Sequence, residues 1–484
     1  MKNFRYKKYH PLLVGLVLPP FIFGQSNNVK PNFLIIQCDQ LSQKVVGTYG
    51  SPYGLTSVID EYARQGVAFL NAYVGCPLSQ PSRAGLWTGM MPHQTGVKSN
   101  SPSPNNPIIS DSIETLGDLF TSNGYEAVHF GKTHDMGSLR GFIHKEPIPE
   151  PFADDRFFVN KDSYLDVGTR KDAIDYLTKP HHRPFICIVD FQNPHNICGF
   201  VGANEHTQVD SIQAVNFPEL PHNFEIKDWN NLPISIQYLC CTHRRLEQAS
   251  RWTKENYRYY LAAYLYYTGM VMQQIKCVID ALNSSPEKDN TIIVFLADHG
   301  DGMAAHRMVT KSTVFYDEIT KVPFIISGPG IKSRKQPIKE ILVSPTLDLL
   351  PTLCDLAGIK IPPSKQGISL LPILKGEKQV QKRQYVVSEW YSEYEKTIAP
   401  GRMIRSGRYK YIHYLEGDDE ALYDLEKDPG ETCNIVTSLN HKSILGEHRK
   451  MLDDYLVSTN DNYRHLRIKV DRKKHKLGYF NHEK

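Results

Sequence analysis

The chain has 484 residues, of which 40% are hydrophobic, and this is enough for one large domain and a smaller one with packed cores. Its formal net charge of +4 is too small to indicate a nucleic-acid-binding protein, although a mildly basic chain suits an anionic substrate. The same balance of apolar and charged residues excludes an intrinsically disordered chain.

The N-terminus predicts a secretory signal peptide. A basic start, residues 2–8, precedes the apolar run Leu12–Phe23. This run is short for a membrane-spanning helix, and Pro19-Pro20 within it disfavours a straight helix. We therefore assign residues 1–25 to a signal peptide, and we expect an exported, periplasmic protein without an integral membrane segment.

Strand and helix patterns alternate along residues 26–376. Short apolar runs bounded by polar residues predict buried strands at 33–38, 67–72, 124–130, 185–191, 291–297 and 322–327. Helical spacing of apolar residues predicts helices at 57–65, 113–123 and 257–282. This alternation predicts an α/β domain with a large mixed, mostly parallel sheet sandwiched by helices, in which ligands bind beyond the carboxyl ends of the strands.

The pattern changes in residues 377–484. Strands are predicted at 385–390 and 409–414, a turn at Asp428-Pro429-Gly430 and a closing helix at 441–456. We expect a smaller C-terminal α+β subdomain with a small antiparallel sheet and a terminal helix. The basic stretch 464–476 is typical of a solvated tail.

Two pairs of polar residues follow predicted strands. Asp39-Gln40 comes after the first strand and Asp298-His299 after the strand at 291–297. Three oxygen-bearing side chains and one imidazole suit a hard divalent cation, Ca²⁺ or else Mg²⁺. In isolation, Asp39 could instead cap a helix, and Asp298-His299-Gly300 could be a tight turn.

The segment from Ser79 to Gly89 contains a serine followed at fixed spacing by Pro81, Arg83 and Thr88. This pattern resembles the signature of the formylglycine-dependent sulfatases, although a loop leading into a helix would explain it equally well alone. Further parts of the family's pattern occur in order between about residues 31 and 434: Asp39-Gln40, Gly131-Lys132-Thr133-His134, Pro194-His195, Asp298-His299-Gly300, Lys311 and Tyr423–Glu431. Thr133 stands where the family has an aromatic residue.

The resemblance implies an alkaline-phosphatase-like fold for residues 26–376 and a modified nucleophile. Ser79 would be oxidised to formylglycine by a serine-type, anaerobic maturation enzyme. One hydroxyl of the formylglycine hydrate would attack sulfur, and the other would later lose its proton and release sulfate. The metal ligands would be Asp39, Gln40, Ser79 in its modified form, Asp298 and His299.

The resemblance also implies roles for the basic residues. Lys132 and Lys311 would contact sulfate, His134 would assist elimination, and His195 would lie at the leaving group. Arg83, one helical turn after Ser79, would hold the nucleophile or the metal-bound oxygens. Lys132 and His134 alternate along a segment predicted to be extended, and so would face one side. Arg83 could also be an ordinary surface arginine, and His134 a half-buried strand histidine.

Residues 390–417 are reminiscent of bacterial glycosaminoglycan sulfatases, which implies an O-sulfated saccharide as substrate. Candidate sugar contacts are His306, Arg402 and Arg405, although the arginines could equally be surface charges. Two other functions remain open at this point. One is a phosphonate monoester or phosphodiester hydrolase of the same fold, and the other is a non-catalytic saccharide-binding protein.

Overall fold

The computed structural model describes Met1 and residues 30–100, 107–148, 165–203, 217–226, 229, 232–237, 244–311, 314–391 and 400–466. The predicted signal peptide, apart from Met1, and most of the basic C-terminal stretch lie outside these residues. Residues 31–484 form one compact unit. Within its described part, no helix is long and apolar enough to cross a membrane.

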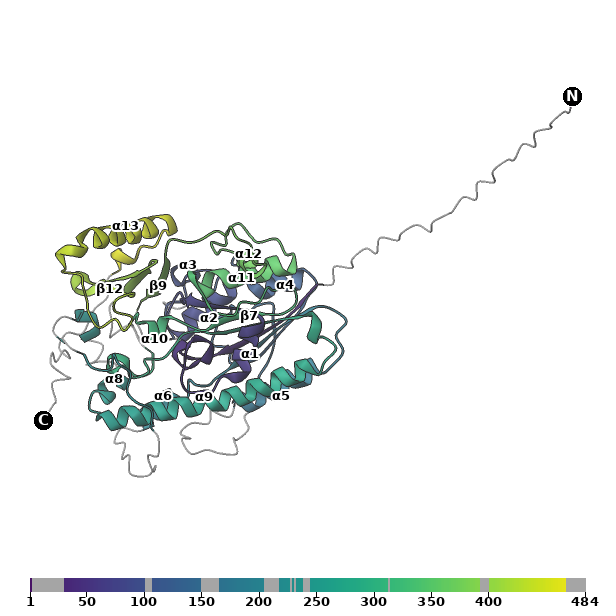
Figure 1. Cartoon of the computed structure of the whole chain (residues 1–484), viewed down its shortest axis with the longest axis horizontal. Coiled ribbons are helices and arrows are strands. Elements are labelled where there is room, and N and C mark those ends of the chain that lie inside the picture. The colour runs from purple at the N-terminus through teal and green to yellow at the C-terminus, as the bar shows by residue number, and fades with distance from the viewer. Residues whose placement is uncertain are drawn as a thin grey trace. The chain divides into compact units, whose positions relative to one another are not determined.

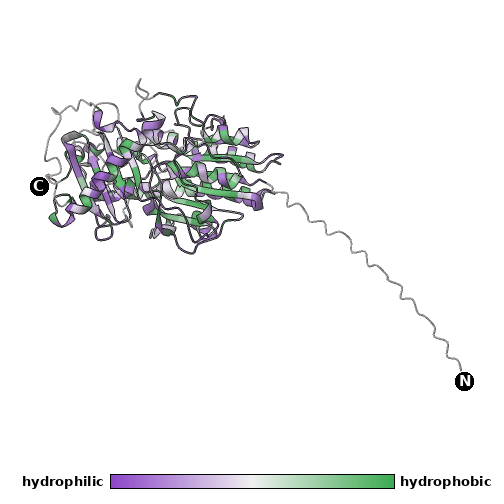
Figure 2. Ribbon diagram, turned by 90° about the horizontal axis from the view of Figure 1, so that it is seen from above, coloured by the Kyte–Doolittle hydropathy of each residue, from purple (hydrophilic) through white to green (hydrophobic). Residues whose placement is uncertain are grey.

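An eight-stranded sheet organises this unit, with strand order β4-β3-β5-β1-β6-β7-β2-β8. The strands are β1 (Asn32–Cys38), β2 (Val67–Ala72), β3 (Glu126–Gly131), β4 (Ile143–Lys145), β5 (Phe185–Phe191), β6 (Thr291–Ala297), β7 (Phe324–Ser327) and β8 (Ile338–Val343). Only β7 runs antiparallel to its neighbours β6 and β2. Figure 2 shows hydrophobic residues concentrated in the strands, as expected for a sheet buried on both faces.

Helices cover both faces of this sheet (Figure 1). One face carries α1 (Ser57–Gln65), α5 (Leu165–Leu177), α6 (Ile197–Ala203), α8 (Arg244–Ala249) and α9 (Lys254–Asn283). The other carries α2 (Ser79–Thr88), α4 (Leu116–Ser122), α11 (Pro345–Ala357) and α12 (Leu371–Leu374). In β1, Leu34 and Ile36 pack on the first face, whereas Phe33 and Ile35 pack on the second, because successive side chains of a strand alternate.

The predicted α/β architecture is confirmed. The predicted helices at 57–65 and 257–282 correspond to α1 and α9, and all six predicted strands are present. The edge strand β8 and the helices α5 and α11 were not predicted.

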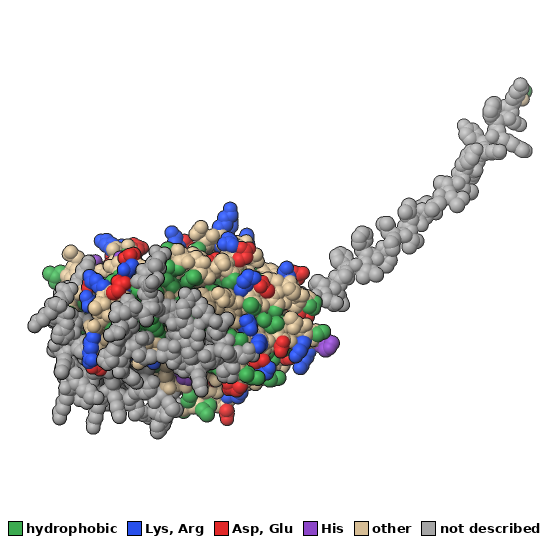
Figure 3. Space-filling view, turned by 90° about the horizontal axis from the view of Figure 1, so that it is seen from below, with side chains coloured by type: hydrophobic (Ala, Val, Ile, Leu, Met, Phe, Trp, Pro, Cys, Tyr) green, Lys and Arg blue, Asp and Glu red, His purple; other side chains and the backbone are tan. Residues whose placement is uncertain are grey.

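Basic and acidic side chains are interspersed over the face shown in Figure 3.

A four-stranded antiparallel sheet forms the C-terminal subdomain, with strand order β12-β11-β10-β9. Its strands are β9 (Val386–Trp390), β10 (Gly401–Arg405), β11 (Tyr409–Tyr414) and β12 (Asp419–Asp424), and α13 (Lys442–Thr459) packs on β10 and β11. This confirms the predicted small sheet and terminal helix. Residues 401–405 form an inner strand of the sheet, and this determines the surroundings of their arginines.

A buried ion pair joins the C-terminal subdomain to the short helix α3 (Pro92–Thr95). The Nδ1 atom of His93 lies 2.6 Å from Oε1 of Glu389, and its Nε2 lies 3.2 Å from the carbonyl oxygen of Thr459. Both partners accept hydrogen bonds, so the ring donates from both nitrogens and is an imidazolium. Burial opposes this charge, but Glu389 raises the pKa of His93 above its ordinary value.

We predict a pH-dependent contribution of His93 to stability. Because the folded-state pKa is raised, the contribution is complete below the ordinary value of 6.5 and is lost as pH rises through the folded-state pKa. At pH 6, His93→Ala should lower the free energy of unfolding by about 2 kcal/mol. Thermal melts across pH should show this deficit shrinking in alkaline buffer. His182→Ala, at an exposed position, should show no such trend, and a pH-independent deficit for His93→Ala would refute the prediction.

Candidate active site

Arg83 gathers three carboxylates beyond the carboxyl ends of β1, β5 and β6. Its guanidinium contacts Oδ2 of Asp39 at 3.2 Å and Oδ2 of Asp298 at 3.0 Å, and it forms a short contact with Asp190. All four side chains are completely buried. Arg83 is therefore not a surface arginine, because its charge compensates carboxylates that would otherwise repel one another in a low-dielectric interior.

Ser79 is the first residue of α2, one helical turn before Arg83. Its Oγ lies 2.9 Å from Nε2 of His299 and 3.2 Å from Nζ of Lys311. The Nδ1 atom of His299 donates to the carbonyl oxygen of Gly300 at 2.8 Å. Burial lowers the pKa of His299, so the ring is neutral and its Nε2 lone pair faces Ser79.

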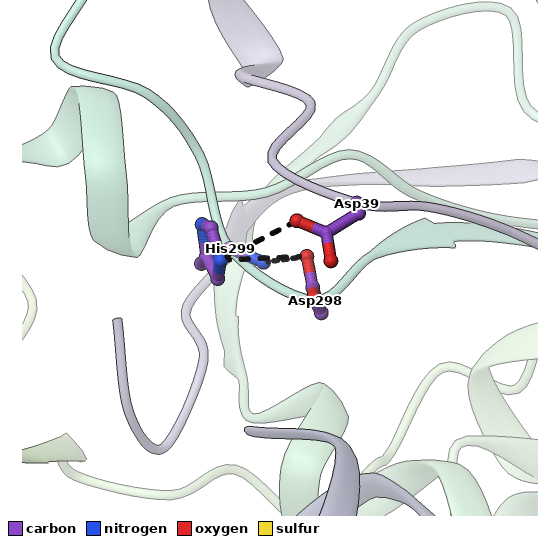
Figure 4. Close-up of side chains that lie close together, drawn as sticks. All are labelled: Asp39, Asp298 and His299. Carbon is purple, nitrogen blue, oxygen red and sulfur yellow. Dashed lines mark hydrogen bonds and ion pairs between the residues drawn. The ribbon is translucent and has the colours of Figure 1, made fainter. Parts of the chain in front are cut away.

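Asp39, Asp298 and His299 can hold a metal ion. One ligand atom of each lies within 4.8 Å of the others, and Figure 4 shows the three side chains turned toward a common point. Oδ1 of Asp39 is buried and accepts no hydrogen bond from the described residues. An orphaned carboxylate oxygen beside an unprotonated imidazole nitrogen fits a divalent cation. The ion's identity does not follow from these residues.

Gln40 is oriented by a buried network that includes α9. Its Nε2 donates to Oδ2 of Asp301 at 2.7 Å, which turns its Oε1 toward Lys311, 3.1 Å away. The other oxygen of Asp301 accepts from the Tyr260 hydroxyl and from the backbone N–H of Met303. Tyr260 also accepts from the N–H of Thr310 at 2.8 Å, next to Lys311. One tyrosine of α9 thus supports both the predicted ligand Gln40 and the lysine beside Ser79.

This network predicts that Asp301→Asn weakens divalent-cation binding. The carboxylate accepts from three donors, so an amide at this position must turn its NH₂ group toward one of them. The least constrained response is a flip of Gln40, which replaces its Oε1 by an NH₂ group that cannot ligate a cation. We expect Ca²⁺ affinity, measured by calorimetry, to fall about 10- to 100-fold.

The matched control is Asp348→Asn. Asp348 is also fully buried and accepts backbone N–H groups, from Ser344 and Ile368, but it lies on α11 away from Gln40. It should lower the melting temperature and leave Ca²⁺ affinity unchanged. Unaltered Ca²⁺ affinity in Asp301→Asn would show that Asp301 does not position Gln40.

Lys132 and His134 lie in the loop after β3 rather than in an extended segment, and that part of the prediction was wrong. Gly131 ends β3 with φ +100°, and a Cβ there would lie 2.0 Å from the carbonyl oxygen of Asp190. His134 has φ +41°, a left-handed conformation. Lys132 still forms an ion pair with Asp39 at 2.5 Å. Burial and the charge of Lys132 lower the pKa of His134 to about 3, so its ring is neutral.

His195 is held by the loop that follows β5. Asp166, in the first turn of α5, accepts from the backbone N–H groups of Gln192 at 2.6 Å and Asn193 at 3.1 Å. Gln192 in turn places its Nε2 2.9 Å from Nδ1 of His195. Burial and the charges of Lys132 and Lys311 lower the pKa of His195. With Nδ1 accepting from Gln192, the neutral ring carries its proton on Nε2.

The three residues predicted as sugar contacts, Arg402, Arg405 and His306, are buried. Arg402 is completely buried, and its guanidinium binds Asp461 at 2.7 Å and the carbonyl oxygens of Trp390 and Gly401. Arg405 is also buried and donates to the hydroxyl of Tyr73 at 3.1 Å.

His306 is only 4% exposed. Its ring stacks on that of Tyr316 with centroids 3.9 Å apart. Its Nε2 lies 3.4 Å from Nδ2 of Asn223, so the ring is packed among residues of the protein itself.

Sequence reasoning missed four buried polar residues that support this site: Asp166, Asp190, Tyr260 and Asp301. A signal existed for Asp190, because a carboxylate within the apolar strand Phe185–Phe191 must be compensated. Asp301 follows Asp298-His299-Gly300 closely enough to have been a candidate. Asp166 and Tyr260 lie in helical segments that offered no comparable cue.

The chain is similar to known sulfatases over most of its length. The model of the sulfatase family matches residues 31–359, and that of the N-sulphoglucosamine sulphohydrolase C-terminal region matches residues 305–458. A Δ4,5-hexuronate-2-O-sulfatase from Bacteroides thetaiotaomicron is 60% identical over 456 residues, covering 94% of this chain and 95% of the relative.

Solved structures agree with this assignment. The structure of a 2-O GAG sulfatase has a TM-score of 0.91 and 59% identity, covering 94% of this chain and 98% of the other. A phosphonate monoester hydrolase of Agrobacterium radiobacter has a TM-score of 0.69 at 21% identity, covering 88% of this chain and 95% of the other, and so shares only the fold. The chain belongs to the sulfatase family and is a sulfuric ester hydrolase.

Proposed function

We propose that this protein removes a 2-O-sulfate from a hexuronate residue of glycosaminoglycan-type saccharides, using formylglycine formed from Ser79 and one divalent cation, Ca²⁺ or else Mg²⁺. The observation that carries the proposal is the 60% identity, over nearly the whole of both chains, to a Δ4,5-hexuronate-2-O-sulfatase. The site supports it, because the polar side chains around Ser79 supply what cleavage of an anionic ester requires.

The metal would be held by Asp39, Gln40, Asp298 and His299, with residue 79 beside it. When bound, a divalent cation would neutralise sulfate oxygens and lower the pKa of the nucleophile. Formylglycine would supply a nucleophilic hydrate, which the unmodified Ser79 hydroxyl lacks.

Lys132 and Lys311 bracket the nucleophile and would hold the anionic sulfate. Lys311 lies 3.2 Å from Oγ of Ser79, and Lys132 is paired with Asp39. Arg83 holds the carboxylates beneath them in place through its ion pairs. The two lysines would therefore stabilise the sulfate group, whose charge distribution changes during the reaction.

His195 would act at the leaving oxygen. Burial is the main cause of the low pKa of His195 in the free protein, and the charges of Lys132 and Lys311 lower this pKa further. A bound sulfate would offset those two charges and raise the pKa. The Gln192 amide would then turn its oxygen to Nδ1, and the protonated ring would act as a general acid. His134, neutral in the free protein, would accept the proton lost when the hydrate releases sulfate.

Maturation and export complete the proposal. Ser79 would require a serine-type, anaerobic maturation enzyme as partner. Residues 1–25 would direct the chain out of the cytoplasm to the periplasm, where extracellular saccharide fragments arrive.

The test is sulfate release from a matched panel of unsaturated disaccharides that carry a single sulfate at the 2-O position of the hexuronate, or at the 4-O or 6-O position of the hexosamine. We expect release from the 2-O isomer alone, abolished by chelation. Adding an aryl phosphonate monoester tests the enzymes that share this fold. Faster turnover of that compound, or of a 4-O or 6-O isomer, would refute the proposed substrate.

A further inference from the structure

A basic groove lies at the far edge of the main sheet. It has a volume of about 1100 Å³ and is bounded by edge strand β8, the start of β2, the end of α1 and the segment after α12. Six basic residues line it: Arg64, Arg334, Lys335, Lys339, Lys378 and Lys382. None of the residues assigned to the active site lines this groove.

The positive charge of the groove is compensated only in part by acidic residues of its own lining. Only three acidic residues, Asp60, Glu340 and Glu377, line it. Asp60 already accepts from the N–H of Thr48 at 2.6 Å and from the hydroxyl of Thr56 at 3.0 Å. Among the ion pairs of the described residues, only Arg64 of the six basic side chains has a partner, Glu61.

Exposure makes these charges available to a ligand. The side chains of Arg334, Lys335, Lys339, Lys378 and Lys382 all belong to exposed residues. Cations from three separate segments of the chain converge on one concave surface, and a concave basic surface concentrates the field that attracts an anion. The volume slightly exceeds that of ordinary ligand sites, which span about 300–1000 Å³, as a site for a longer chain requires.

We propose that this groove is a second, non-catalytic binding site for a polyanionic saccharide chain. The charge and shape of the groove indicate a polyanionic ligand independently of the proposed function. That this polyanion is a saccharide rests on the proposed function. It would retain longer sulfated chains at the enzyme while their ends are processed elsewhere.

The groove and the catalytic centre are too far apart for one small substrate. Strand β8 is the fourth strand from β1 in the sheet order, and at about 4.8 Å per strand this places them roughly 19 Å apart across the sheet. A disaccharide bound at Ser79 therefore leaves the groove free, whereas a dodecasaccharide is long enough to occupy the groove by itself.

Lysines on an edge strand have another known role, which is to prevent unwanted strand pairing. That role would account for Lys339 on β8. It does not account for Lys378, Lys382 or Arg334, which lie outside the strand and face the same groove. The protective role also requires no saturable affinity for a ligand, and this separates the two explanations.

The experiment measures binding of a fluorescent heparin dodecasaccharide to the Ser79→Ala protein by anisotropy, at about 0.15 M salt, where long-range electrostatics are largely screened. The groove variant carries K335E, K339E and K378E. Its control carries K360E, K427E and K442E, three exposed lysines outside the groove, so that both variants change the net charge equally. We expect at least a tenfold loss of affinity in the groove variant and less than a twofold loss in the control.

Competition and catalysis complete the design. An unlabelled 2-O-sulfated disaccharide should not displace the dodecasaccharide, and the groove substitutions, placed in the protein with Ser79 intact, should leave disaccharide turnover unchanged. Equal losses in the two variants, displacement by the disaccharide, or equally tight binding of a DNA oligonucleotide of matched charge would overturn the proposal. Failure of disaccharide turnover in the unsubstituted enzyme would instead refute the proposed function, and binding to the groove would still be measurable.

Discussion

Ser79→Ala should abolish sulfate release, lowering kcat/KM by at least about 10⁴-fold, a loss typical for removal of a nucleophile. The hydroxyl oxygen of Ser79 lies between His299 and Lys311, where no other hydroxyl of the described residues contacts both groups. Alanine cannot be oxidised to an aldehyde, so neither the hydrate nor its oxygens can form. Steady-state sulfate release by protein from a host with serine-type maturation measures the effect.

The informative control is Ser79→Cys, produced with cysteine-type maturation machinery. It should regain activity, because the mature residue would be the same. Calorimetry should also show that Ser79→Ala still folds with a near-native melting temperature, since it loses only the contacts of one hydroxyl group with His299 and Lys311. Substantial turnover by the alanine variant would mean that another residue attacks sulfur.

Arg83→Gln should be the most destabilising single substitution in the site. It removes the charge that compensates Asp39, Asp190 and Asp298, all completely buried. Breaking a buried ion pair from one side costs about 3–5 kcal/mol, and here three carboxylates lose a cationic partner together, although Asp39 keeps its ion pair with Lys132. Urea unfolding should show a loss of at least this size, and sulfate release should fall below detection.

Two further variants make this prediction specific. Arg83→Lys retains a charge but not the planar fork that reaches three carboxylates, so its stability should be intermediate. Arg64→Gln removes an exposed arginine paired with Glu61 and should change stability by less than about 0.5 kcal/mol. A stable, active Arg83→Gln protein would contradict the role given to this arginine.

The order of elements and the position of the site followed from local patterns. A buried strand followed by an acidic residue can be recognised from the sequence alone. Both Asp39 and Asp298 lie where the ends of β1 and β6 were predicted. The short spacing from Ser79 to Arg83 predicted a common helical face, and the structure places Ser79 beside His299 and Arg83 beside the preceding Asp298.

Residues whose surroundings come from distant segments could not be predicted in this way. Arg402 was predicted as a sugar contact because residues 390–417 are reminiscent of bacterial glycosaminoglycan sulfatases. Its partner Asp461 lies 59 residues away, and its aromatic neighbours Tyr391 and Tyr463 come from separate segments. The burial of an arginine depends on such pairings, which local composition does not contain.

The conformation of the loop after β3 was predicted wrongly for a different reason. An alternating Lys-Thr-His segment after a strand favours continued extension, but Gly131 and His134 both have positive φ angles, and the chain leaves the sheet. Tertiary contacts with Asp39 and Asp190 decide that path. The sequence pattern therefore predicted that Lys132 lies near Asp39, but it did not predict the backbone conformation that places Lys132 there.

The most direct test of the account is sulfate release from the 2-O-sulfated disaccharide across preparations with different extents of oxidation at residue 79. Mass spectrometry of the peptide containing residue 79 gives that extent, because formylglycine is lighter than serine by two hydrogen atoms. The account predicts turnover proportional to the formylglycine fraction, reaching zero in unmodified protein. Full turnover by protein that carries only serine at position 79 would contradict it.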